Sequence, residues 1–184
     1  MKKLTYLFMV LAIIASLPSC DKETTDNGVA TLKTAYVLSS STPVSDGGVV
    51  PVILAVDNPR GGNVTCTDVE EAFSDTLVCG EKINYSDEIQ FEGAFPEFLN
   101  VDLDGIHISF NMEECVMIND KYYKVGAVIV KGGNSANVYY YENGVLSDAG
   151  LAAPGDKHMV SNLTFCFIEC EEEEDLIIAA KVWY

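Results

Sequence analysis

Short segments in which apolar and polar residues alternate recur along this chain, and they constrain its fold more than any other feature. Ile106, Ile108 and Phe110 alternate with polar residues. This period of two places one face of a strand in a core and the other in water. Similar strand-like segments occupy residues 34–38, 49–56, 122–130, 138–141, 163–168 and 175–184. The chain is therefore expected to consist of strands nearly throughout.

Turn signals separate these segments. Gly combines with Asp, Asn or Pro at residues 46–48, 58–62, 104–105, 132–134 and 143–144. Such combinations favour the tight turns that connect antiparallel strands. The pattern predicts an all-β fold, and its simplest form is a two-sheet β-sandwich of the Ig-like or jelly-roll-like kind.

One segment, residues 67–73, has a helical pattern instead. Glu70 follows Thr67 by three positions, which is the spacing of a capping box with a threonine at the helix N-terminus. The sequence thus predicts one short helix beside the sheets, with Thr67 as its N-cap.

The N-terminus is organised as an export signal. Lys2 and Lys3 precede an apolar stretch of about fourteen residues, shorter than the roughly twenty that a membrane-spanning helix needs. The residues Leu17-Pro18-Ser19-Cys20 then resemble a lipobox, although Pro18 departs from the usual small residue. We expect residues 1–19 to be removed as a signal peptide and Cys20 to carry the acyl chains that anchor the protein to a membrane.

Residues 20–30 are expected to form a flexible tether, because after Cys20 they are polar, acidic or small and have little to bury. No linker divides residues 31–184, which suit a single β-sandwich domain. The acidic residues of the tether resemble the surface-export signals of some Gram-negative lipoproteins. The expected location is therefore the outer membrane, facing the cell surface, with the periplasmic face as an open alternative.

The chain is strongly acidic. Removing Lys2 and Lys3 from its 11 Lys and Arg leaves nine, against 28 Asp and Glu. This balance excludes nucleic acid as a partner, because binding to phosphates requires a basic face. Solubility explains the acidity most simply, and binding of a divalent cation or a cationic partner is the alternative.

Five cysteines remain after Cys20, and they are Cys66, Cys79, Cys115, Cys166 and Cys170. Disulfides persist in exported proteins, and an odd number leaves at least one cysteine unpaired or bonded elsewhere. Cys166 and Cys170 would lie roughly 13 Å apart on a straight strand, beyond disulfide reach. They should therefore bond to other cysteines.

No placed catalytic residue, metal site or cofactor motif is found. There is no CxxC pair for zinc, and the chain has only His107 and His158 as imidazoles. Asp102-Leu103-Asp104-Gly105 resembles the opening of a calcium loop, but the later carboxylates of an EF-hand are missing. No GxSxG elbow occurs either. The sequence predicts a protein that is not an enzyme.

Four motifs follow one another in the second half of the chain: VIVKGG at residues 128–133, NVYYY at 137–141, SDAGLAAP at 147–154 and SNLTFC at 161–166. In this order they resemble a β module of secreted and cell-surface bacterial proteins, whose pattern runs VIVKGG, N-x-Y-x-Y, SDTGLHAP and LSHISFC. An earlier cysteine element of that family resembles Asn63-Val64-Thr65-Cys66.

The resemblance implies a disulfide between Cys66 and Cys166. It implies no defined catalytic activity. Ala152 and Asn162 stand where the family often has histidines, so a chemistry that depends on those imidazoles would be absent. This departure favours a structural or recognition role.

Two motif elements are candidates for ligand binding. Tyr139, Tyr140 and Tyr141 place two rings on one face of a strand and one on the other, so core packing is the first interpretation and an aromatic sugar platform the second. Lys131 ends an apolar strand, where its stem can pack while its ammonium group reaches an oxygen. A structural role for Lys131 is favoured over a catalytic one.

The leading functional hypothesis is a non-enzymatic surface lipoprotein that recognises a glycan or protein ligand or serves as a scaffold. The alternative is a fimbrillin-like pilus subunit, processed after Arg60, which is the only arginine of the chain. A periplasm-facing accessory lipoprotein and a hydrolase are lesser alternatives. The sequence leaves the oligomeric state open.

Overall fold

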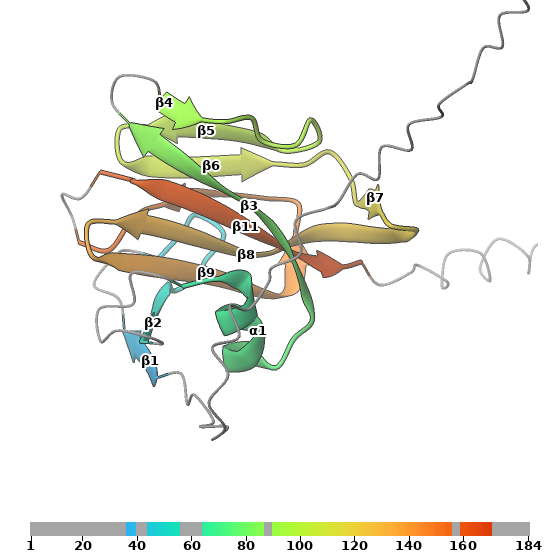
Figure 1. Ribbon diagram of the computed structural model, residues 1–184, viewed down its shortest axis with the longest axis horizontal. Coiled ribbons are helices and arrows are strands. Elements are labelled where there is room, and N and C mark those ends of the chain that lie inside the picture. Colours follow the sequence, from blue (N-terminus) through green and yellow to red (C-terminus); the bar gives the residue numbers. More distant parts are fainter. Residues whose placement is uncertain (1–35, 40–43, 56–63, 87–89, 156–158, 171–184) are drawn as a thin grey trace, which may run out of the picture.

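The computed structural model describes residues 36–39, 44–55, 64–86, 90–155 and 159–170. In these ranges the chain folds into two packed β-sheets and one short helix, as the alternation predicts (Figure 1). The strands are β1 (Tyr36–Ser39), β2 (Val52–Ala55), β3 (Leu77–Ser86), β4 (Gln90–Glu92), β5 (Asn100–Asp104), β6 (His107–Asn111), β7 (Val116–Ile118), β8 (Lys121–Gly132), β9 (Ser135–Val145), β10 (Ser147–Leu151) and β11 (Asn162–Glu169).

The larger sheet has the order β1-β2-β9-β8-β11-β3-β4, and β7 pairs with the start of β8. At its centre, β8 lies between β9 and β11 and is antiparallel to both. Residues 125–130 of β8 are all buried. This strand therefore needs a cover on each of its two faces.

The smaller sheet, with the order β10-β6-β5, covers one of these faces. Ile108 and Phe110 of β6 share a core with Val128 and Val130 of β8 and with Phe165 of β11. Phe110 and Phe165 meet edge to face, with ring centroids 5.5 Å apart. The alternation in residues 106–111 thus predicts the buried face of β6 correctly for Ile108 and Phe110.

Helix α1 (Cys66–Phe73) covers the opposite face of the larger sheet (Figure 1). Val69 of the helix is fully buried against a second core that includes Ala127 and Ile129 of β8. A disulfide joins Cys66, at the start of α1, to Cys166 of β11 and closes a loop with a sequence separation of 100. The helix and the larger sheet are therefore linked covalently as well as by packing.

The helix lies where the sequence predicts it, but its N-cap differs. Thr65 is the cap, and its side chain accepts a hydrogen bond from the backbone N–H of Asp68, while the Asp68 carboxylate accepts one from the backbone N–H of Thr65. The prediction of Thr67 as N-cap with Glu70 was therefore wrong by two positions. Asp68 performs the role expected of a Glu, because its shorter side chain still reaches the cap backbone.

Two hairpin turns follow from residues that tolerate positive φ. Gly133, with φ +60°, and Asn134 connect β8 to β9, and the turn at Gly132-Gly133-Asn134 is the one that the sequence predicts. Asn119 and Asp120, with φ of 51° and 66°, connect β7 to β8. Positive φ at both central residues is typical of a type I′ turn.

Asn143-Gly144 does not form the predicted turn. Both residues lie within β9, where the pairing with β8 shifts between Val125↔Val145 and Ala127↔Tyr140. Gly144 has φ +60°, so it supplies an irregularity inside a continuous strand and not the end of one. The predicted turn at residues 58–62 and the predicted strand at 175–184 lie outside the described residues.

The disulfide between α1 and β11 is expected to contribute strongly to stability. Replacing both of its cysteines (Cys66→Ala with Cys166→Ala) should lower the free energy of unfolding by about 2–5 kcal/mol, since a long loop is no longer closed in the unfolded chain. Chemical denaturation of the full mature chain measures the loss. A double variant as stable as the parent would contradict the role given to this bond.

Candidate functional site

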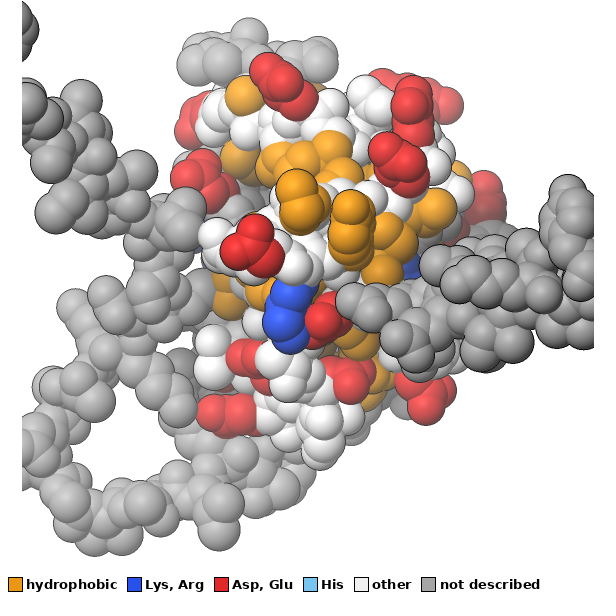
Figure 2. Space-filling view, turned by 90° about the vertical axis from the view of Figure 1, so that its right-hand side faces the viewer, with side chains coloured by type: hydrophobic (Ala, Val, Ile, Leu, Met, Phe, Trp, Pro, Cys, Tyr) orange, Lys and Arg blue, Asp and Glu red, His pale blue; other side chains and the backbone are white. Residues whose placement is uncertain are grey.

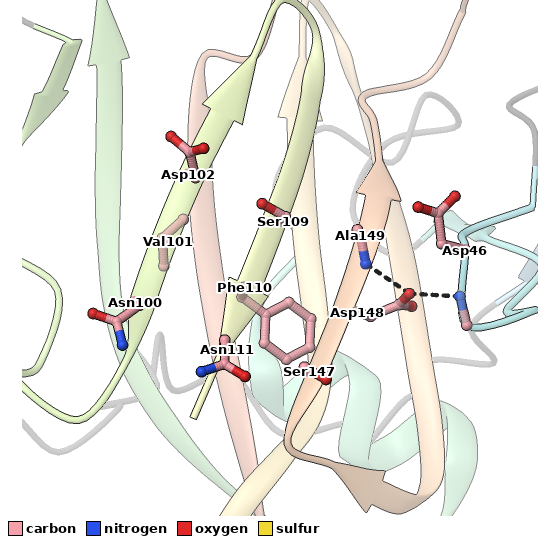
Figure 3. Close-up of a pocket in the computed structure, with 11 residues that line it drawn as sticks. Asp46, Asn100, Val101, Asp102, Ser109, Phe110, Asn111, Ser147, Asp148 and Ala149 are labelled. Carbon is pink, nitrogen blue, oxygen red and sulfur yellow. Dashed lines mark hydrogen bonds between the residues drawn. The ribbon is translucent and has the colours of Figure 1, made fainter. Parts of the chain in front are cut away.

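A groove crosses the smaller sheet and is the candidate site. Its volume is about 510 Å³, and β5, β6, β10 and the loop at Asp46 and Gly47 line it (Figure 3). We call it the sheet groove. The three strands that build it have five residues each and carry polar side chains on their outer face. Their inward side chains, such as Ile108 and Phe110, pack in the core between the sheets.

The strand register arranges the polar side chains of the sheet groove in rows. Asn111 of β6 is paired with Asn100 of β5 on one side and with Ser147 of β10 on the other. In the next row, Ser109 of β6 is paired with Asp102 of β5. Because side chains alternate between the faces of a strand, these amide, hydroxyl and carboxylate groups share one face of the sheet. Four of the five are exposed and Ser109 is half-buried.

A tight loop before β2 forms one wall of the sheet groove. Ser45 is buried, and its hydroxyl accepts a hydrogen bond from the Val49 N–H at 3.1 Å, while its carbonyl accepts one from Gly48. The Asp46 N–H donates a hydrogen bond to the carbonyl of Ala149 at 2.9 Å, and this bond attaches the loop to β10. The Asp46 side chain is exposed beside the groove, on the far side of it from Asp102 (Figure 3).

Asp148 of β10 holds this wall in place. Its side chain is only 8% exposed. One oxygen, Oδ1, accepts hydrogen bonds from the N–H groups of Gly47 and Ala149, both at 2.7 Å, and Oδ2 accepts one from the Tyr141 hydroxyl at 2.8 Å. A buried carboxylate that is satisfied in this way by fixed donors is a structural group and not a reactive one.

Burial also keeps the tyrosine that donates to Asp148, Tyr141, in its protonated form. Desolvation, together with the hydrogen bond to Asp148 and its charge, raises the pKa of Tyr141 far above its ordinary value. Its hydroxyl therefore remains a donor at all physiological pH values. Gly47 is required for the same contact, because a Cβ there would lie 2.8 Å from Oδ1 of Asp148.

The chemistry of the sheet groove is neutral to acidic. Asp46 and Asp102 supply carboxylates, and none of the described residues that line the groove is Lys, Arg or His. Phosphate, sulfate and other anionic groups would be repelled. The described ranges also contain no group of three or more His, Cys, Asp or Glu residues that could hold a metal ion.

The three tyrosines lie on β9, apart from the groove rows. Tyr139 is fully buried, and its hydroxyl accepts a hydrogen bond from the Ala152 N–H at 2.9 Å, while Tyr141 is also in the core. Tyr140 faces the other side of the sheet, where its ring stacks on Phe73 with centroids 3.9 Å apart and its hydroxyl donates to Asp75. Burial raises the pKa of both Tyr139 and Tyr140. In this structure the rings pack within the protein and form no open platform.

Lys131 lies near the end of β8, where it is paired with Ala136 of β9. Its carbonyl accepts hydrogen bonds from the backbone N–H and the hydroxyl of Ser161. Lys131 is half-buried and does not line the sheet groove. Cys20 and Arg60 lie outside the described residues.

The described cysteines form two disulfides. The bond between Cys66 and Cys166 is the pairing that the family resemblance implies. The other bond joins Cys115 and Cys170, so Cys166 and Cys170 do bond to other partners, as their spacing predicts. Cys79 takes part in neither bond and lies opposite Cys166 on β3.

Sequence reasoning missed the sheet groove. A signal was present, since Asn100, Asp102 and Asp104 alternate with Val101 and Leu103 in the manner of a half-buried strand. The acidic residues of this segment suggested the start of a calcium loop instead. The role of Asp148 could not be read from the sequence, because its donors come from the distant Gly47 and from Tyr141.

Comparison with known proteins adds no further constraint. No family model, curated protein or solved structure matches the chain. The resemblance to a secreted and cell-surface β module therefore stays a prediction from its motifs, which here fall on β8, β9, β10 and β11. No helix in the described part of the chain has the length and hydropathy to cross a membrane.

Removing the Asp148 carboxylate should loosen the wall of the groove. We expect Asp148→Ala to lower the free energy of unfolding by about 3 kcal/mol, because three donors lose their acceptor. Asp148→Asn should cost less, since an amide oxygen can still accept from the two backbone N–H groups. Chemical denaturation gives both values. Exposed Asp102→Ala is the matched control and should change stability by less than about 0.5 kcal/mol.

Proposed function

We propose that the protein is a non-enzymatic, lipid-anchored recognition protein of the cell surface, and that the sheet groove binds a neutral saccharide. The observation that carries the proposal is the pair of rows formed by Asn100, Asn111 and Ser147 and by Asp102 and Ser109. Amide, carboxylate and hydroxyl groups offer both donors and acceptors to the hydroxyls of a sugar.

The charge of the groove narrows the class of ligand. With carboxylates at Asp46 and Asp102 and no cation in its lining, the groove favours neutral or amino sugars over phosphorylated, sulfated or uronic ones. The groove is also preformed, because the hydrogen bonds of Asp148 fix the loop at Gly47 before any ligand binds. A preformed site loses less conformational entropy when a ligand binds.

Export from the cytosol, which a surface location requires, is supported by two features. The N-terminal residues have the pattern of an export signal that ends at Cys20. Disulfides such as Cys66–Cys166 and Cys115–Cys170 form and persist in oxidising compartments outside the cytosol. Lipid attachment at Cys20 would leave the β-sandwich in water while tying it to the membrane.

A glycan array probed with the full mature chain tests the ligand class. We expect retention of neutral or amino-sugar glycans, and Asn111→Ala should weaken their binding about 3- to 10-fold, as expected for one lost hydrogen bond. Asn84→Ala on β3 is the control, because Asn84 is also an exposed strand asparagine but lies outside the groove. Absence of any retained glycan, or equal losses for both variants, would refute the proposed saccharide site.

Mass spectrometry of the protein from protease-treated and untreated intact cells tests the location. The proposal requires an acylated Cys20 at the N-terminus and loss of the domain after treatment. An intact protein on treated cells would mean that it faces the periplasm. A mature chain that begins at Gly61 would instead support the pilus subunit.

A further inference from the structure

The hairpin of β7 and β8 presents two large apolar side chains to solvent. Met117 of β7 and Tyr122 of β8 are directly paired across the hairpin. Met117 is 64% exposed and Tyr122 is 53% exposed. Single exposed apolar residues are ordinary, but these two are neighbours on one face.

The core of the protein does not account for this exposed pair. On the other face of the same hairpin, Val116 and Tyr123 pack against the core between the sheets. Alternation then directs Met117 and Tyr122 away from that core. Their side chains are thus available to a partner without any loss of packing.

The hairpin is fixed in shape. Its turn at Asn119 and Asp120 has positive φ at both residues, and the disulfide Cys115–Cys170 ties the start of β7 to the end of β11. The Cys170 N–H donates to the carbonyl of Tyr122 at 2.7 Å. Two exposed apolar side chains on a rigid support lose little entropy on binding.

Acidic residues lie close to the exposed pair in the chain. Glu113, Glu114 and Asp120 are exposed just before the hairpin and in its turn. Glu169 of β11 is also exposed, but it is paired with Tyr123 and so lies on the other face. Lys121 is already paired with Glu169, with its Nζ 2.6 Å from Oε2. Figure 2 shows hydrophobic side chains gathered on this side of the molecule with acidic side chains around them.

We infer that Met117 and Tyr122 form a docking surface for a protein whose contact surface has an apolar centre bordered by Lys and Arg. Tyr and Met are enriched at protein interfaces, and the acidic border gives charge complementarity to a basic one. A second copy of this acidic chain, or an anionic lipid surface, would meet like charge instead. This inference is independent of the saccharide proposed for the sheet groove.

Two amphipathic helical peptides test the inference, one of Leu and Lys and a matched one of Leu and Glu. We expect the full mature chain to bind the Leu/Lys peptide, and Met117→Thr with Tyr122→Thr to weaken that binding about tenfold or more. Val50→Thr is the control, because Val50 is also 64% exposed but precedes β2. It should leave the affinity unchanged.

Several results would overturn the docking surface. Equal binding of the Leu/Lys peptide by the double variant would show that the acidic surface alone attracts it, and equal binding of the Leu/Glu peptide would remove the role of charge. If the parent protein forms a concentration-dependent dimer that the double variant does not form, the pair mediates self-association instead. If the parent sediments with phosphatidylcholine vesicles and the double variant does not, the pair binds lipid instead. Because both residues are exposed, the variant is expected to fold, and its denaturation midpoint verifies this.

Discussion

The pairing of β8 with β11 is the interaction on which the other layers depend. These two strands form the centre of the larger sheet and send alternate side chains to opposite cores. Val128 and Phe165 face the smaller sheet, whereas Ala127 and Cys166 face helix α1. Because one pair of strands supplies both cores, the smaller sheet and the helix are positioned by the same backbone hydrogen bonds. The sheet groove and the β7–β8 hairpin are both attached to this centre.

A buried polar group connects the layers in addition to apolar packing. Asp148 lies on the smaller sheet, its partner Tyr141 on the larger one, and Gly47 in the loop before β2. A carboxylate in such a position is costly to bury unless each oxygen has a donor, and here each has at least one. The same hydrogen bonds that satisfy Asp148 therefore set the distance between the loop and β10, and with it the width of the groove.

The sequence predicts the fold class and the central strands, because their apolar periods are long and their turns carry glycine. It does not predict β3 or β10, in which polar residues and glycine interrupt the alternation. The helix N-cap was misplaced because two threonines compete and only the three-dimensional contact between Thr65 and Asp68 decides between them. The groove rows were missed for a related reason, since they depend on cross-strand register, which local sequence does not encode.

The order of the cysteines in the two disulfides has a consequence for biogenesis. Cys115 lies between Cys66 and Cys166 in the chain, and Cys166 lies between Cys115 and Cys170, so the two bonds interleave. If the chain is exported from its N-terminus, as residues 1–20 predict, Cys66, Cys79 and Cys115 would enter an oxidising compartment before Cys166. Oxidation in order of emergence would join the wrong sulfurs. Chains that oxidise in this order would then need thiol–disulfide exchange after nearly the whole domain has been exported, a step that an isomerase accelerates.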